Sequence, residues 1–346
     1  MTWVSENSYN IYRNYVSTYC SKEVLKYNIF NSIKSYKGKR IYKCNIKDVD
    51  LLLKQEELYV NRDDIEHEYY VGLLLNNIRQ YIPNFVSTIG YFKGNPGTKN
   101  ISPCSKKVNS EMHVRFLLLE IIPGQHVYKE LHIDDHFRLL IQIAFALEIV
   151  QKEYGFVHYN LHRGNVMMKQ LSRDVLIKYP NFQLQTNTIA VIIDFGRSYS
   201  NKTGGHELKE KRVFPKFHRH YDIFTYIHSC LDETYPSIMN DLFEFYGYSK
   251  WTKHRNFAKL LDDIVIQKYP LIDRSAVDLV LYISKKYNFN HIYRNDLPIY
   301  NPQTPVSSMR QDVLLNSVNH IEPTKLRSAS ENEIKDIKNT IFSSYH

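Results

Sequence analysis

The chain has few cysteines and no closely spaced pair of them. Its 346 residues include four, all far apart in the sequence: Cys20, Cys44, Cys104 and Cys230. Structural zinc sites use cysteine or histidine ligands at short spacings, and disulfide frameworks are typical of short secreted chains. The sequence therefore predicts neither kind of site. It favours reduced thiols in an intracellular, cytoplasmic protein.

Long apolar runs and a signal-peptide pattern are also missing. The longest apolar runs, such as FLLLEII at 116–122, fall far short of the roughly 18 residues that suggest a membrane span. The first residues, MTWVSENSYNIYRNYV, lack a basic stretch followed by an apolar one. We therefore expect neither a membrane span nor a secretory leader.

The excess of positive charge is mild. The net charge is +9 and the pI about 9.1, with 23% of residues charged and 43% hydrophobic. A basic excess favours phosphate-bearing partners, but here it is spread over a long chain. Nucleic-acid binding is thus a hypothesis that rests on charge alone, and we do not expect it as the main function. The hydrophobic share is enough for a sizeable core.

Hydrophobic periodicity separates a strand-rich first third from a helix-rich remainder. Alternation and short apolar runs predict four strands in the first third: 40–46, 49–54, 85–92 and 114–121. Apolar residues at three- and four-residue steps predict helices over 62–82 and 134–155. After the second helix we expect a strand over 165–169, a linker over 170–188 and a very apolar strand over 189–194.

This order of elements predicts an α+β protein with two lobes and a hinge near residue 121. The expected parts are a short helical N-terminal extension (1–35), a small β-rich N-lobe with one main helix (36–121), a larger helical C-lobe (122–295) and an extended C-terminal tail (296–346).

Two short motifs carry residues suited to phosphate and metal chemistry. The apolar strand IAVIID ends at Asp194, and FG follows it. Upstream, HYNLHRGN begins at His158 and ends at Asn165. Carboxylate and amide oxygens are the hard ligands that Mg²⁺ prefers. The patterns H-x-N-L-x-x-x-N and I-I-D-F-G together match the catalytic loop and metal-binding loop of protein kinases.

On these motifs the chain resembles the protein kinase superfamily, over about residues 38–235. Its short segments HEYYVG, IPNF, LLLE and LHRGNV most resemble those of kinase-like proteins encoded by large DNA viruses. The resemblance implies a bilobal kinase-like fold and phosphate transfer from ATP with Mg²⁺, most readily to a Ser/Thr hydroxyl. It also implies a protein substrate or a regulatory protein partner. A viral origin would place the protein in the host cytoplasm or the virion.

The resemblance gives roles to residues that bind nucleotide and metal. Lys54 would hold the α- and β-phosphates, and Glu68 would pair with it. Glu66 is the neighbouring candidate, but two helix positions turn it about 200° away from Glu68. Asn165 and Asp194 would bind Mg²⁺. Simpler readings make Lys54 a solvated lysine at a strand end and Glu68 a surface charge.

Other roles concern the frame of the site. The backbone at Glu120 and Ile122 would bond the adenine ring, as a hinge does in this family. His158 would be a structural histidine of the loop. Asp222 would be a buried anchor that holds the loop by its backbone, with a helix N-cap as the alternative.

The chain departs from the family pattern at the catalytic base. Asn160 stands where the family has an aspartate that accepts the proton of the attacking hydroxyl. An amide keeps the shape but has no useful basicity, and general-base catalysis contributes roughly 10²–10⁴-fold. His162 replaces the loop lysine, and a phosphate contact is favoured for it over the role of a base.

Two further motifs are missing. Gly38 is the only glycine shortly before the strand that carries Lys54, so no glycine-rich phosphate loop is present. No A-P-E motif occurs in the roughly 25 residues between Gly196 and Asp222. Two hypotheses follow. One is a phosphotransferase weakened or inactivated by Asn160. The other is a nucleotide-binding pseudokinase that acts through protein interactions.

Overall fold

The computed structural model describes most of the chain between residues 32 and 300. The described ranges are 32–35, 41–46, 49–56, 65–79, 81–94, 114–205, 217–248, 257–265, 271–289 and 297–300. All of them belong to the first of two units, Met1–Thr304, and the second, Pro305–His346, lies outside them. Most of the expected extension and tail, the loop at 95–110 and the basic segment at 206–212 also lie outside the described residues.

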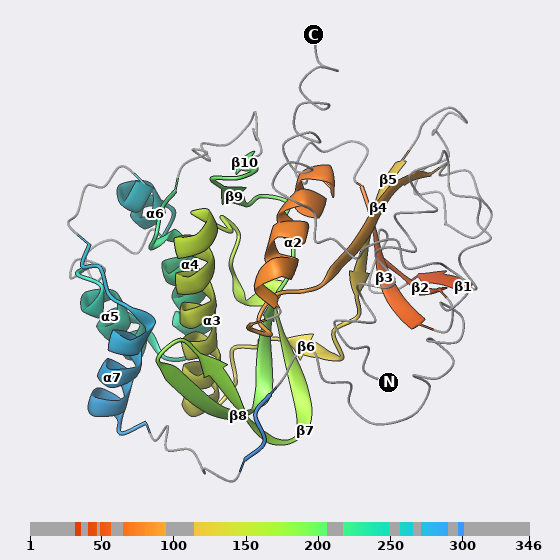
Figure 1. The fold of residues 1–346 in the computed structure, drawn as a ribbon. Coiled ribbons are helices and arrows are strands. Elements are labelled where there is room, and N and C mark those ends of the chain that lie inside the picture. Colours follow the sequence, from red (N-terminus) through yellow and green to blue (C-terminus); the bar gives the residue numbers. More distant parts are fainter. Residues whose placement is uncertain are drawn as a thin grey trace. The chain divides into compact units, whose positions relative to one another are not determined.

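A five-stranded antiparallel sheet forms from the strand-rich first third (Figure 1). Its strands, in the order β1-β2-β3-β5-β4, are β1 (Ser32–Ser35), β2 (Ile41–Ile46), β3 (Val49–Gln55), β4 (Thr88–Gly94) and β5 (Val114–Glu120). The four predicted strands are thus confirmed, with β4 starting later than expected. The expected helical extension is wrong at its end, because Ser32–Ser35 pair with β2 as a strand.

Helix α2 (Ile65–Arg79) packs against β4 and β5 of this sheet, as Figure 1 shows. It confirms the helix predicted over 62–82. Its apolar side chains Val71, Leu75 and Ile78 are buried at three- and four-residue steps. The same buried face also holds two charged residues, Glu68 and Arg79. Buried charges need partners, so both point to specific ion pairs.

Helix α3 (Ile133–Tyr154) is the longest of the described helices and has most of its residues buried, and it confirms the prediction over 134–155. His132 caps its first turn by accepting a hydrogen bond from the backbone of Asp134. The helix ends at Gly155, which has a φ of +56° and donates to the carbonyl of Gln151. Glycine adopts this left-handed conformation at little cost, which explains the sharp stop.

The linker expected over 170–188 is wrong, because this stretch is most of a long β-hairpin. Strands β7 (Val166–Tyr179) and β8 (Phe182–Ile192) pair on both sides of an irregularity between Gln170 and Val175, and β6 (Gly124–His126) lies on the other side of β7. A two-residue turn, Pro180 and Asn181, joins the two strands, and Asn181 has a φ of +62°. Proline followed by a residue with positive φ is the combination that a type II turn requires.

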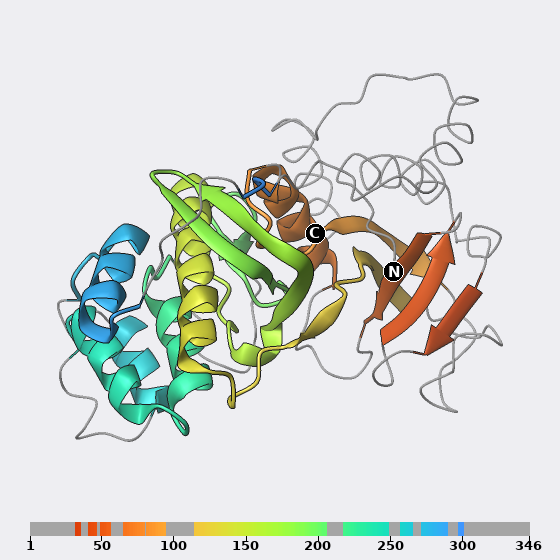
Figure 2. The same ribbon diagram turned by 90° about the horizontal axis from the view of Figure 1, so that it is seen from below.

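The hairpin forms because one of its faces has a helix to cover. Phe145 of α3 stacks on Tyr179 and Phe182, with ring centroids 4.6 and 5.0 Å apart. The outward residues of the hairpin are polar, so its composition is that of a linker while its alternation is that of a strand. Figure 2 shows the hairpin alongside α3.

Four shorter helices complete the described part of the helix-rich remainder: α4 (Tyr221–Leu231), α5 (Pro236–Phe245), α6 (Phe257–Val265) and α7 (Ala276–Tyr287). Helix α3 contacts α4 and α7 as well as β8, so it lies between the hairpin and these helices (Figures 1 and 2). The result is a mixed α+β chain with small antiparallel sheets. Within the described ranges, no helix has the length and apolar character needed to cross a membrane.

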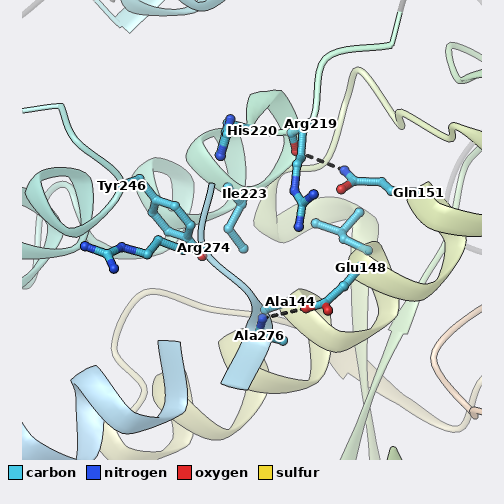
Figure 3. A pocket seen from close by; sticks show the side chains of 10 residues that line it. Ala144, Glu148, Gln151, Arg219, His220, Ile223, Tyr246, Arg274 and Ala276 are labelled. Atoms are coloured by element: carbon cyan, nitrogen blue, oxygen red, sulfur yellow. Dashed lines mark hydrogen bonds between the residues drawn. The ribbon is translucent and has the colours of Figure 1, made fainter. Parts of the chain in front are cut away.

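A small cavity lies where α3 meets the starts of α4 and α7 (Figure 3). Glu148 of α3 accepts a hydrogen bond from the backbone of Ala276 at 2.6 Å, which places a carboxylate at the N-terminus of α7. Gln151 donates to the carbonyl of Arg219 at 2.9 Å. These contacts fasten three helices together, and the lining contains none of the residues expected at the functional site.

Candidate functional site

Lys54 joins the five-stranded sheet to α2 and to the end of the β7–β8 hairpin. It lies on β3, and its ammonium group is 2.7 Å from a carboxylate oxygen of Glu68 and 2.5 Å from one of Asp194. Glu68 is 1% exposed, whereas Lys54 and Asp194 keep 14% and 28% of their side-chain surface. A cation between two carboxylates satisfies the buried acid and leaves the second one facing solvent.

The neighbouring acid, Glu66, has different partners. It accepts hydrogen bonds from Arg115 at 3.1 Å and from the hydroxyl of Tyr91 at 3.3 Å. The turn of the helix between Glu66 and Glu68 places them on different sides of α2. Glu68 therefore faces Lys54, the pairing that the resemblance implies, and it is not a surface charge.

Asp194 follows β8 in an uncommon backbone conformation, with a φ of +70°. Burial would raise the pKa of its carboxyl group, but the charge and hydrogen bond of Lys54 outweigh this and hold the pKa below its usual value. Asp194 is therefore ionised at neutral pH. A positive φ outside glycine needs support from its surroundings, and such residues are concentrated at functional sites.

The strand register brings Asn165 beside Asp194. Val166 at the start of β7 pairs with Ile192 at the end of β8, and the backbone of Ile193 donates to the carbonyl of Asn165 at 3.0 Å. The side-chain amide of Asn165 donates to the carbonyl of Asn160 at 2.8 Å. Its Oδ1 accepts no hydrogen bond from the described residues, so an amide oxygen and a carboxylate come from adjacent strand ends.

Asp222 holds the loop between α3 and β7 by its backbone. Its two carboxylate oxygens accept from the N–H groups of His158 at 2.7 Å and of Tyr159 at 2.9 Å. Tyr159 has a φ of +59°, so these bonds fix a left-handed turn of the loop. Helix α4 begins at Tyr221 with His220 as its N-cap, so the N-cap alternative for Asp222 is wrong.

Burial shifts the pKa values of both Asp222 and His158. It raises the pKa of Asp222 to about 7, although the two backbone N–H groups act in the opposite direction. His158 is completely buried, and burial lowers its pKa to about 4. The Nε2–H group of His158 donates to the carbonyl of Ile193 at 2.9 Å, and its ring packs against Phe195. His158 is therefore a neutral structural residue between the loop and the strand that ends at Asp194.

The ring of His162 has its proton on the nitrogen that faces away from the loop backbone. Its Nδ1 accepts a hydrogen bond from the N–H of Gly164 at 3.0 Å, so the neutral ring carries its proton on Nε2. Burial lowers its pKa, although Asp194 nearby raises it. A ring with Nδ1 engaged and Nε2 protonated donates a hydrogen bond but does not accept a proton. This geometry disfavours His162 as a replacement for the base that Asn160 lacks.

The end of β5 contains a buried ion pair that the sequence did not indicate. Arg79, in the last turn of α2, bonds Glu120, and it also donates to the carbonyl of Phe85. Burial alone would raise the pKa of Glu120, but Arg79 and Lys169 beside it hold the pKa below its usual range. The carboxylate of Glu120 is thus buried, ionised and paired with Arg79. In the sequence, this ion pair could have been suspected only from Arg79, a charged residue on the apolar face of the predicted helix.

The segment after β5 keeps a backbone group available. The N–H of Ile122 makes no backbone hydrogen bond within the described residues, while its side chain is buried. Two residues later, Gly124 begins β6. A Cβ on Gly124 would lie 1.9 Å from the carbonyl oxygen of Met168, so only glycine lets β6 pair closely with β7.

Comparison with known proteins gives a partial similarity to viral proteins. No protein-family model matches the chain. It is 27% identical, over 195 residues and 52% of this chain, to Probable kinase 098L of Invertebrate iridescent virus 3. The chain is similar to a probable viral kinase. The matched segment spans 34% of that relative's length.

Two other iridescent virus proteins, both named as uncharacterized, are also similar. Protein 035R of Invertebrate iridescent virus 3 is 25% identical over 193 residues, which is 47% of this chain and 18% of the relative. Protein 179R of Invertebrate iridescent virus 6 is 23% identical over 148 residues, which is 40% of this chain and 12% of the relative. The chain is therefore similar to parts of longer viral proteins, one of which is named a probable kinase.

Proposed function

We propose that the chain is an ATP- and Mg²⁺-binding protein with the two-lobed arrangement of a protein kinase. The single observation that carries the proposal is the contact chain from Glu68 through Lys54 to Asp194. It links a sheet, a helix and a strand end that are far apart in the sequence. Opposite charges held together at the edge of the core, with one carboxylate partly exposed, are typical of functional sites.

The donor set fits a magnesium nucleotide. Asp194 supplies an ionised carboxylate, and Asn165 supplies an amide oxygen from the adjacent strand end. The N–H of Ile122 is suited to bond an adenine edge, and His162 can donate its Nε2–H to a phosphate oxygen. A bound Mg²⁺ would neutralise charge on the phosphates. Within this set, Lys54 orients Asp194 and offers its ammonium group to phosphate.

As a phosphotransferase, the protein would act on a hydroxyl acceptor, most readily Ser or Thr of a protein. Asn160 would orient that hydroxyl through its amide oxygen without accepting its proton. Transfer would be slow, because positioning and electrostatic stabilisation remain while the base is missing. The engaged Nδ1 of His162 supports an alternative, a pseudokinase that binds nucleotide and works as a protein-interaction module.

The nucleotide proposal is tested by thermal unfolding with and without Mg·ATP. We expect the wild type to be stabilised, and Asp194→Asn and Lys54→Met to lose that stabilisation. Lys43→Met is a matched control, because Lys43 lies on the neighbouring strand β2 and pairs with Asp50 at the surface. Absence of any shift in the wild type at millimolar Mg·ATP would refute the nucleotide site.

A second experiment separates the phosphotransferase from the pseudokinase. Asn160→Asp restores a carboxylate of the same shape, and we expect it to raise phosphate transfer to a generic Ser/Thr substrate by roughly 10²–10⁴-fold. Transfer is measured with γ-labelled ATP, and Asn160→Asp/Asp194→Asn serves as the inactive control. Transfer that stays at background in Asn160→Asp, in a protein that binds Mg·ATP, favours the pseudokinase.

A further inference from the structure

His67 of helix α2 reaches the segment that follows Asp194. Its Nε2 lies 2.7 Å from the backbone carbonyl oxygen of Ser198, across 131 positions of sequence. A carbonyl oxygen only accepts, so Nε2 must carry the proton and donate. The His67 side chain is partly buried and Ser198 is fully buried. The bond is therefore largely shielded from competing water.

The turn that contains Ser198 is held by several bonds. The N–H and the hydroxyl group of Ser198 both donate to the carbonyl of Phe195, at 3.0 and 2.6 Å. The next residue, Tyr199, exchanges two backbone hydrogen bonds with Val157, at 2.9 and 2.7 Å. These bonds fix the turn against itself and against the loop before β7. The bond from His67 fixes it against α2.

Helix α2 thus reaches the segment 194–198 from two consecutive residues. Glu68 acts through Lys54 on the side chain of Asp194, and His67 acts directly on the backbone of Ser198. Consecutive helix residues point about 100° apart, so the two attachments resist different rotations of the helix. Asp194 has a φ of +70°, a conformation that persists when surrounding bonds determine it.

We propose that His67 is a positioning residue: its Nε2–H group holds the Ser198 carbonyl and thereby keeps the Asp194 carboxylate placed for a divalent cation. This inference rests on the proposed nucleotide site and names a residue that sets its cation affinity. Glu66, on the same helix, instead accepts hydrogen bonds from Arg115 and Tyr91. It provides a control that changes α2 without changing this contact.

The test compares His67→Leu, His67→Gln and Glu66→Gln with the wild type. A glutamine amide places an N–H donor near the position of Nε2, whereas leucine has none. At saturating ATP, we expect His67→Leu to weaken apparent Mg²⁺ affinity roughly 3- to 10-fold, as loss of one shielded hydrogen bond predicts. His67→Gln and Glu66→Gln should stay near wild type, and ATP affinity in EDTA should not change. A residue that only stabilised the fold would not separate Mg²⁺ affinity from ATP affinity.

Hydrogen exchange in the unliganded proteins provides a readout that needs no nucleotide. We expect faster exchange of the Ser198 and Tyr199 amides in His67→Leu and wild-type protection in His67→Gln. Wild-type exchange and Mg²⁺ affinity in His67→Leu would overturn the positioning role alone, as would failure of His67→Gln to restore them. Failure of the wild type itself to bind Mg·ATP would overturn the proposed function and this role together.

Discussion

Replacing Lys54 by methionine tests the central ion pair most directly. The change removes the ammonium group that lies between Glu68 and Asp194 and keeps most of the aliphatic stem. Asp194 is 28% exposed and can be solvated after the change. Glu68 is 1% exposed and cannot, so its carboxylate is left buried without this partner. The main cost therefore falls on Glu68.

The magnitude follows from the protonation of that carboxylate. A buried Glu68 that has lost the Lys54 ammonium group takes up a proton, and protonating a carboxyl group of ordinary pKa at pH 7 costs about 4 kcal/mol. This agrees with the roughly 3–5 kcal/mol lost when one partner of a buried ion pair is removed. At pH 5 the same protonation costs only about 1 kcal/mol. We therefore expect Lys54→Met to lower the free energy of unfolding by about 3–4 kcal/mol at pH 7 and far less at pH 5.

Urea unfolding at the two pH values measures this difference, with the midpoint and the slope fitted together. Lys54→Met/Glu68→Gln should recover most of the lost stability at pH 7, because the neutral amide carries no buried charge. Lys43→Met should cost about 0–1 kcal/mol, since it breaks an exposed pair with Asp50. A loss below about 1 kcal/mol for Lys54→Met, or strictly additive effects in the double variant, would refute the buried pairing.

Three further predictions concern the frame of the site. The pKa of His158 is lowered to about 4 in the folded protein, so the unfolded chain binds a proton that the folded chain does not as pH falls below 6.5. Linkage then predicts that His158 by itself contributes a loss of about 2 kcal/mol between pH 7.5 and pH 5, so the pH dependence of stability in urea should differ by that amount between the wild type and His158→Phe. Asp222→Asn replaces one of the two carboxylate oxygens that accept from backbone N–H groups by an amide NH₂ group, which donates. We expect the free energy of unfolding to fall by about 2–3 kcal/mol, with faster amide exchange at His158 and Tyr159. Gly124→Ala forces β6 away from the carbonyl of Met168, and denaturation should show a loss of about 1–3 kcal/mol, whereas the exposed neighbour Gln125→Ala should be neutral.

The hairpin over β7 and β8 shows why part of the fold was missed from sequence. The stretch expected as a linker alternates polar and apolar residues, but its polar face dominates the composition. Whether such a stretch becomes a strand depends on what covers its apolar face. Here Phe145 of α3 stacks on both sides of the turn, and nothing local indicates that contact.

Some residues of the site could be predicted from the sequence, and others could not. Asp194 and Asn165 could be found because each follows or precedes an apolar strand in a motif of fixed spacing. The pairing of Arg79 with Glu120 could not, because it joins the end of a helix to the end of a strand 41 positions later. His67 was missed for the same reason, since its partner is a backbone carbonyl that no sequence pattern marks.

By itself, the sequence determined the local elements and the chemistry they carry: the strands of the first third, α2 and α3, the end of α3 at Gly155 and the presence of Asn160 in place of a base. These follow from periodicity and residue type, which act over a few positions. Tertiary structure decided that Arg79 pairs with Glu120, that Nδ1 of His162 is engaged, and that Asp194 meets a lysine 140 positions away. Ion pairs and hydrogen bonds of this kind depend on which groups are buried together, and burial is a property of the whole fold.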